Sequence, residues 1–253
     1  MISPRLEDLE RRFQDHLNRR RSTREDDMPD SFTDRLLQPG DRAPNIILDA
    51  ITRQGKVSID EFRGQRPVLV GLFRGLHCPF CRRQITSMAS LASDLRELGI
   101  DSLTVVNTPI ERARLYFRYH PLPNLLAASD PERISHRAFG LPNVEFTESE
   151  TAWPHKVGMD VLASMKIDMP KELPEPMGVM AATEYLDKAD GYEFTEDDRQ
   201  MIAGGEGQLV GEFLLDRDGV VRWCFTEVAD NGRQMFGVPA AQDLMSAASN
   251  IAA

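Results

Sequence analysis

Hydrophobic and polar positions follow two different periods along the middle of the chain. Residues 68–73 (VLVGLF) are apolar at every position, which is typical of a strand buried on both faces. Residues 79–98 instead place apolar side chains every three or four positions, which predicts an amphipathic helix that ends at Gly99. The same order recurs as a buried strand over residues 100–106 and a helix over residues 110–119. The pattern therefore predicts strands that alternate with helices.

Shorter elements flank this centre. They are strands at residues 45–50, 125–128, 212–215 and 220–225, and helices at residues 131–139 and 242–251. The last two strands flank the sequence DRDG, which is typical of a hairpin turn. Together these elements predict an α/β fold with a mixed central sheet and helices on both of its faces.

Two segments depart from this order. Residues 1–21 place Leu6, Leu9, Phe13 and Leu17 on one face of a helix, and residues 22–34 are polar and rich in helix breakers. We therefore expect an N-terminal helical extension and linker over residues 1–36, and a main domain over residues 37–253. An isolated helix of this length is marginal, so it needs the main domain or a second copy of the chain, in a homodimer, to dock on.

The second departure is an acidic insertion (residues 142–206) placed before the last hairpin. It holds 15 Asp and Glu against 5 Lys and Arg, together with six of the eleven Met residues and several prolines. Within it, residues 178–189 look helical, and Thr195 with Asp198 resembles a helix N-cap. Two interpretations stay open: a solvated acidic flap, or a substrate lid or partner surface that uses adaptable Met side chains.

Composition excludes several classes of function. Outside the insertion the 253-residue chain carries 25 acidic and 25 basic residues, so a basic face for nucleic acid is not expected. No apolar run approaches the roughly 18–20 residues of a membrane helix. The N-terminal sequence MISPRLEDLERRF lacks the apolar core of a signal peptide, and three cysteines are too few for a secreted disulfide scaffold, so we expect a cytoplasmic protein.

The candidate chemistry lies in the sequence FRGLHCPFCRR, between the buried strand and the long helix. Cys78 stands at the helix N-cap and Pro79 at the first helical position, where the N–H groups and the helix dipole stabilise a thiolate. Arg74 and Arg82 are candidates to add positive charge. The pattern favours Cys78 as the nucleophile and Cys81, three residues later, as the resolving thiol.

Other interpretations of these residues remain. Paired cysteines can bind zinc or another soft metal, but a structural site wants four ligands, so we expect neither a metal nor a cofactor. His77 either stabilises the thiolate and acts as an acid or base, or makes one backbone hydrogen bond at the rim. Cys224, in a strand of alternating pattern, is interpreted as a packing residue rather than a redox residue.

The sequence resembles a known family over about 170 residues. The stretches GDRAPNIIL, VSIDEFRGQRPVLVGLFRGLHCPFC, SDPERISHRAFGL and GEFLLDRDGVVRWCF are similar to the alkyl hydroperoxide reductase/thiol-specific antioxidant branch of the thioredoxin superfamily. The resemblance implies a thioredoxin-like fold and a peroxiredoxin-like oxidoreductase in which Cys78 is the attacking cysteine. It also implies a disulfide or hydroperoxide substrate and an external thiol reductant such as thioredoxin or glutathione.

The sequence departs from that family at several supporting positions. Peroxiredoxins place a proline seven residues before the reactive cysteine and a hydroxyl residue three before it, where this chain has Gly71 and Gly75. A family arginine is replaced by Val210, and the position of the thioredoxin cis-proline is Gly211. We therefore expect measurable disulfide exchange through Cys78 and weak reduction of hydrogen peroxide. A thioredoxin-fold binding or sensor module is the alternative.

Overall fold

The computed structural model describes residues 35–167, 170–196, 198–199, 206–227 and 235–252. The expected helix over residues 1–21 and the linker over residues 22–34 lie outside the described residues. Among the described helices, none is long and apolar enough to cross a membrane.

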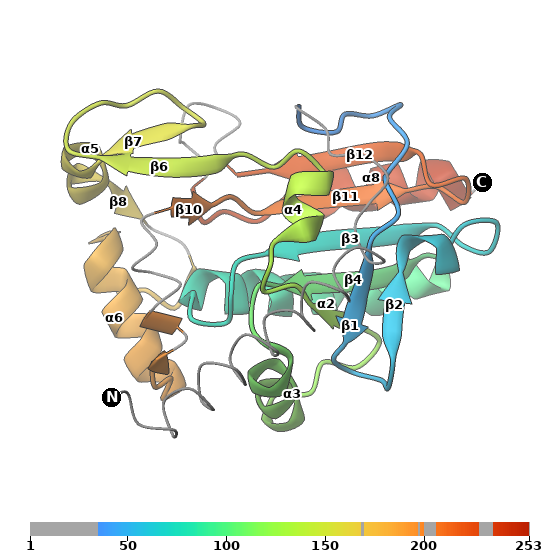
Figure 1. The fold of residues 1–253 in the computed structure, drawn as a ribbon, viewed down its shortest axis with the longest axis horizontal. Helices are drawn as coiled ribbons and strands as arrows, with labels where there is room; N and C mark the ends of the chain where they lie inside the picture. The colour runs from blue at the N-terminus through green and yellow to red at the C-terminus, as the bar shows by residue number, and fades with distance from the viewer. Residues whose placement is uncertain (1–34, 168–169, 197, 200–205, 228–234, 253) are drawn as a thin grey trace, which may run out of the picture.

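A seven-stranded mixed sheet forms the centre of the molecule (Figure 1), in the order β12-β11-β3-β4-β5-β1-β2. Strands β3, β4 and β5 run parallel, and the other neighbours pair antiparallel. The strands are β1 (Ile47–Ala50), β2 (Lys56–Ser58), β3 (Val68–Phe73), β4 (Asp101–Val106), β5 (Leu126–Ser129), β11 (Gly211–Leu215) and β12 (Val221–Thr226). The strands predicted from the apolar runs are therefore present, within one or two residues of their expected ends.

Each face of this sheet has its own apolar core. Alternate residues of β3 divide between the two cores: Leu69 and Phe73 face one, and Val70 and Leu72 face the other. The first core is covered by α2 (Pro79–Glu97), α3 (Ile110–Tyr119), α6 (Val179–Asp190) and α8 (Ala241–Ala252). The second is covered by α4 (Ile134–Ala138) and the segment that enters β1. Helices thus lie on both faces, as the sequence predicts.

Strand β3 and helix α2 approach each other closely at one point. A side chain at Gly71 would place its Cβ 2.5 Å from a ring carbon of Phe73 and 2.8 Å from Met88 Sδ. This glycine therefore allows the helix that carries the cysteines to pack directly on the central strand.

The acidic insertion folds into a separate layer beside the end of α2 that carries the cysteines (Figure 1). A small sheet joins β6 (Asn143–Thr147) to β7 (Lys156–Gly158) and to β10 (Glu206–Gln208), and a two-stranded sheet joins β8 (Lys166–Ile167) to β9 (Met177–Gly178). Helices α5 (Met159–Ser164) and α6 complete the layer, and α6 packs on α2. As predicted, Thr195 and Asp198 exchange side chain to backbone hydrogen bonds of 3.2 and 2.9 Å.

Two elements differ from their predictions. Helix α4 begins three residues later than expected, because the buried Asp130 carboxylate accepts hydrogen bonds from the N–H groups of Ile134 and Ser135 and so fixes its start. In β12, the strict alternation expected of the strand is wrong. Leu214 pairs with Trp223, so a regular ladder would pair Leu215 with Arg222. A bulge pairs Leu215 with Val221 instead, and this places Val221 in the same core as Cys224.

Candidate active site

The turn from β3 into α2 places Cys78 at the N-cap of the helix, with Pro79 in its first turn. The Cys78 Sγ accepts a hydrogen bond of 3.3 Å from the N–H of Cys81. An N-cap acceptor of this kind satisfies one of the free N–H groups of the helix, and the helix dipole favours negative charge there. The predicted position of Cys78 at a helix N-cap is therefore confirmed, and it favours the thiolate.

Arg74 brings a positive charge to both sulfur atoms. Its Nη1 lies 3.7 Å from Cys78 Sγ and 3.5 Å from Cys81 Sγ. Its Nε donates a 2.6 Å hydrogen bond to the carbonyl of Gln208, which fixes the guanidinium in place. The sequence suggested Arg74 as a cation near the pair, and the structure places it in contact with both thiols.

A buried carboxylate, Glu227, holds the other side of this guanidinium. It pairs with Arg74 Nη2 and has no exposed side-chain area. It also accepts hydrogen bonds of 3.1 Å each from Gln84 Nε2 and from the N–H groups of Val210 and Phe236. Sequence reasoning missed Glu227, because it belongs to no motif and lies about 150 residues from the arginine that it binds.

The two thiols differ in acidity. Burial by itself would raise the pKa of Cys78, but the hydrogen bond from the Cys81 thiol, the charge of Arg74 and the Cys81 N–H outweigh it and lower the pKa to about 6. Burial, together with the neighbouring Cys78 thiolate, raises the pKa of Cys81 well above its usual range. At neutral pH this arrangement gives a thiolate at Cys78 beside a protonated thiol at Cys81.

The two roles that the sequence offered for His77 stay predictions. Its Nδ1 is buried and has no hydrogen-bond partner among the described residues. Burial, followed by the positive charges of Arg74 and Arg82, lowers its pKa to about 4 despite the opposing charge of Asp198. His77 is therefore neutral at pH 7 and adds no positive charge to the thiolate.

Arg82 is also turned away from the cysteines, so its suggested role as a second cation for the thiolate is wrong. Its guanidinium is 4% exposed and binds Asp187 and Asp190 of α6, both at 2.7 Å, and the carbonyl of Leu76. The ring of Tyr192 lies 4.3 Å away. Arg82 therefore joins the acidic insertion to the helix that carries the redox pair.

Two stacked aromatic side chains lie beside Arg74. The rings of Phe80 and Phe236 stack with their centroids 4.2 Å apart, and the Arg74 guanidinium lies 5.2 Å from the Phe236 ring centroid. Phe236 has a φ of 63°, a left-handed conformation that is rare for an aromatic residue. Cys78 is 7% exposed and Cys81 is fully buried, so a substrate must approach through a narrow opening.

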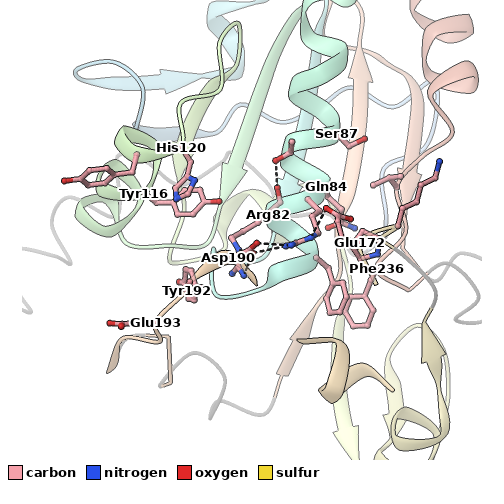
Figure 2. A pocket seen from close by; sticks show the side chains of 18 of the residues that line it. Arg82, Gln84, Ser87, Tyr116, His120, Glu172, Asp190, Tyr192, Glu193 and Phe236 are labelled. Atoms are coloured by element: carbon pink, nitrogen blue, oxygen red, sulfur yellow. Dashed lines mark hydrogen bonds and ion pairs between the residues drawn. The ribbon is translucent and has the colours of Figure 1, made fainter. Parts of the chain in front are cut away.

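Two cavities meet at Phe236. The larger, of about 760 Å³, runs along the outer face of α2 between α3 and the end of α6. Figure 2 shows its lining, in which Arg82 and Asp190 lie together at one side and Tyr116 and His120 at another. The smaller, of about 320 Å³, lies on the other side and reaches Arg74 and His77.

Among the described residues, neither a metal-binding cluster nor a third redox thiol lies near the pair. Within the described part of the chain, no group of three or more Cys, His, Asp or Glu side chains is arranged to hold a metal ion. Cys224 lies half-buried against the second core, and burial raises the pKa of its thiol. The structure therefore supports the interpretation of Cys224 as a packing residue.

A thioredoxin-like fold with two thiols at the N-terminus of its first long helix defines the class of thiol oxidoreductases. The sequence of residues 39–162 matches the AhpC/TSA family, so the chain carries an AhpC/TSA family domain, and this match supports a peroxiredoxin-like oxidoreductase activity. The resemblance inferred from the stretches between Gly40 and Leu141 is thereby confirmed. No curated protein sequence matches the chain.

Solved structures share this architecture at low sequence identity. Peroxidoxin BcpB of Mycobacterium tuberculosis is 12% identical, with 85% of this chain and 98% of that one aligned at a TM-score of 0.50. Peroxiredoxin Q of Xanthomonas campestris is 14% identical, with 87% and 100% aligned at a TM-score of 0.48. The first of these likenesses supports the fold, and the family match supports the activity.

Proposed function

We propose that this protein is a thiol–disulfide oxidoreductase in which Cys78 attacks the substrate and Cys81 resolves the intermediate. One observation carries the proposal: a single guanidinium nitrogen of Arg74 contacts both sulfur atoms, and the hydrogen bond from the Cys81 thiol, the charge of Arg74 and the Cys81 N–H together lower the pKa of Cys78 to about 6. This arrangement holds a nucleophilic thiolate beside a protonated partner thiol, as two-step exchange needs.

With a disulfide, the Cys78 thiolate attacks one sulfur, the S–S bond breaks, and one half of the substrate leaves as a thiolate. With a hydroperoxide, the Cys78 thiolate attacks the outer oxygen, the O–O bond breaks, and the inner oxygen leaves as an alcohol after taking a proton, which gives a sulfenic acid at Cys78. Cys81 then loses its proton and attacks Cys78, and the second thiolate or a water molecule leaves. An external thiol reduces the resulting Cys78–Cys81 disulfide.

The surroundings of Cys78 favour exchange over reduction of hydrogen peroxide. At the position three residues before Cys78, Gly75 offers no hydroxyl. Loss of one positioned donor typically costs about 10²–10³ in rate at oxyanion-type sites.

Three serine variants test the assignment of roles. Cys78→Ser is expected to abolish turnover of a disulfide substrate, because the nucleophile is gone. Cys81→Ser is expected to stop after the first step and to accumulate a mixed disulfide on Cys78, which mass spectrometry detects. Cys224→Ser is the matched control, with wild-type turnover. Turnover retained in Cys78→Ser would overturn the proposal.

A further inference from the structure

The larger cavity is separate from the redox pair, since neither Cys78 nor Cys81 lines it. Its volume is about 760 Å³, within the usual range for small-molecule sites. Its floor is the outer side of α2, α3 forms one wall, and residues 170–172 and 190–193 of the insertion also line it. A ligand in this cavity would therefore contact α2, α3 and the insertion without contacting either thiol.

The wall formed by α3 is largely aromatic. Arg112, Tyr116 and His120 follow one another at spacings of four residues, so they share one face of α3 and its C-terminal end. The rings of Tyr116 and His120 stack with their centroids 4.4 Å apart (Figure 2). Leu115 and Tyr119, which are 44% and 73% exposed, also line the cavity. This wall offers flat surfaces on which an aromatic ring can stack.

Two of the arginines in the cavity are already neutralised by carboxylates of the insertion. Arg82 pairs with Asp187 and Asp190, both at 2.7 Å. Arg83 pairs with Asp190 at 2.8 Å and with Glu172 at 3.4 Å. The protein itself therefore compensates the charges of these two arginines.

Arg112 differs from them because it has no such partner. No carboxylate in the described parts of the chain, that of the exposed Glu193 included, pairs with it. Its Nη2 donates a 3.1 Å hydrogen bond to the carbonyl of Glu193, its guanidinium lies 5.2 Å from the ring centroid of Tyr192, and its Nε is buried without a hydrogen-bond partner among the described residues. Lys171, exposed in the same lining, adds a second positive charge. A guanidinium binds a carboxylate through two parallel hydrogen bonds, so Arg112 is suited to a ligand carboxylate.

We propose that this cavity binds small aromatic carboxylates. The carboxylate pairs with Arg112, and the ring lies along the wall that Tyr116 and His120 form. The insertion supplies the other side of the site through Tyr192 and Lys171, so it acts as part of a ligand site and not only as a solvated flap. The proposal goes beyond the proposed thiol chemistry and does not depend on it, because binding involves no covalent or redox step.

Binding of 2-naphthoate, followed by ligand-observed NMR, tests the site. We expect saturable binding to the full chain. The uncharged 2-naphthamide has the same rings, and we expect it to bind at least about tenfold more weakly, because hydrogen bonds between charged groups are the stronger ones. Absence of saturable binding of 2-naphthoate, or equal affinity for the two probes, would overturn the proposal.

Two arginines of α3 provide a matched pair of variants. Arg112 lines the cavity, whereas Arg118, exposed on the same helix, does not. Arg112→Met is expected to weaken binding of 2-naphthoate by about tenfold or more and to leave the weak binding of 2-naphthamide unchanged, because only the charged contact is lost. Arg118→Met is expected to change neither. Equal effects of the two variants, or an equal loss of both probes in Arg112→Met, would contradict recognition of the carboxylate by Arg112.

A third variant tests the location of the site. Ser87 is half-buried on α2 and lines the floor of the cavity. Ser87→Trp fills the cavity from this side and is expected to remove the binding of both probes. Unchanged binding of 2-naphthoate to Ser87→Trp would place the ligand elsewhere on the protein and overturn the proposal.

Discussion

Arg74 and its partner Glu227 have opposite effects on the pKa of the reactive thiol, Cys78. On one side Arg74 contacts the sulfur atoms of Cys78 and Cys81, and on the other it pairs with the fully buried Glu227. Arg74 lowers the pKa of Cys78, and the charge of Glu227 raises it. Glu227 thus orients the guanidinium and partly offsets its charge, which makes it a positioning residue.

This arrangement predicts pKa changes of opposite sign for two variants. In a Cys81→Ser, Cys224→Ser background, whose serine keeps a hydroxyl beside Cys78, iodoacetamide alkylation should rise with pH through a midpoint near 6, because the thiolate is the reactive form. Arg74→Met should move the midpoint upward and Glu227→Gln downward.

The direction for Glu227→Gln separates two roles. If the carboxylate acted only as a structural support for Arg74, its loss would loosen the guanidinium and raise the midpoint. An upward shift, confirmed by absorbance of the thiolate near 240 nm, would therefore contradict the electrostatic role.

At the scale of elements, α2 and α6 are joined by charged groups that differ in burial. Arg82 of α2 is 4% exposed and binds both Asp187 and Asp190 of α6. The neighbouring Arg83, whose side chain is 17% exposed, binds Asp190 at 2.8 Å. Removal of one partner from a buried ion pair leaves an uncompensated charge, while exposed pairs contribute little.

Arg82→Met is therefore expected to lower the free energy of unfolding by about 3–5 kcal/mol. The more exposed Arg83→Met is the control and should lower it by about 1 kcal/mol or less. Urea unfolding measures both, and hydrogen exchange should show that Arg82→Met loosens α6 before the central sheet. Equal losses in the two variants would show that burial of Arg82 does not govern the contact.

At the scale of the whole molecule, the sequence pattern predicted the elements that depend on interactions between neighbouring residues. The apolar run of β3, the period of α2 and the DRDG turn between β11 and β12 each carry their own signal, and all three are present. The N-cap position of Cys78 follows from the same local rules. These features needed no knowledge of distant contacts.

What the sequence did not predict depends on pairings across long separations. Strand β10 pairs with β6 some 60 residues earlier, and Arg74 meets Gln208 and Glu227 from the far end of the chain. Short strands such as β8 and β9 have no periodicity of their own and form only against each other. The smaller cavity is lined in part by Val144 of β6 and Gly207 of β10, so it also depends on these pairings, and no local motif predicts it.

One buried carboxyl, that of Glu212, makes the free energy of unfolding depend on pH. It lies in β11 between β3 and β12 and is 3% exposed. Burial raises its pKa from 4.5 to about 8. Below pH 4.5 the carboxyl is protonated in both the folded and the unfolded chain, so its burial carries no charge cost. Between pH 4.5 and about 8 only the unfolded chain ionises, so the folded state loses stability as pH rises.

Glu212→Gln is therefore expected to stabilise the protein by an amount that depends on pH. The gain should be near zero at pH 4.5, grow by about 1.4 kcal/mol per pH unit up to about pH 8, and stay constant above it. Urea unfolding of variant and wild type at pH 5, 6.5 and 8 measures this difference, with the exposed Glu184→Gln of α6 as the control that shows none. Because the two proteins share every other titrating group, a gain that does not change with pH would mean that Glu212 is ionised in the folded protein and that a partner compensates its charge.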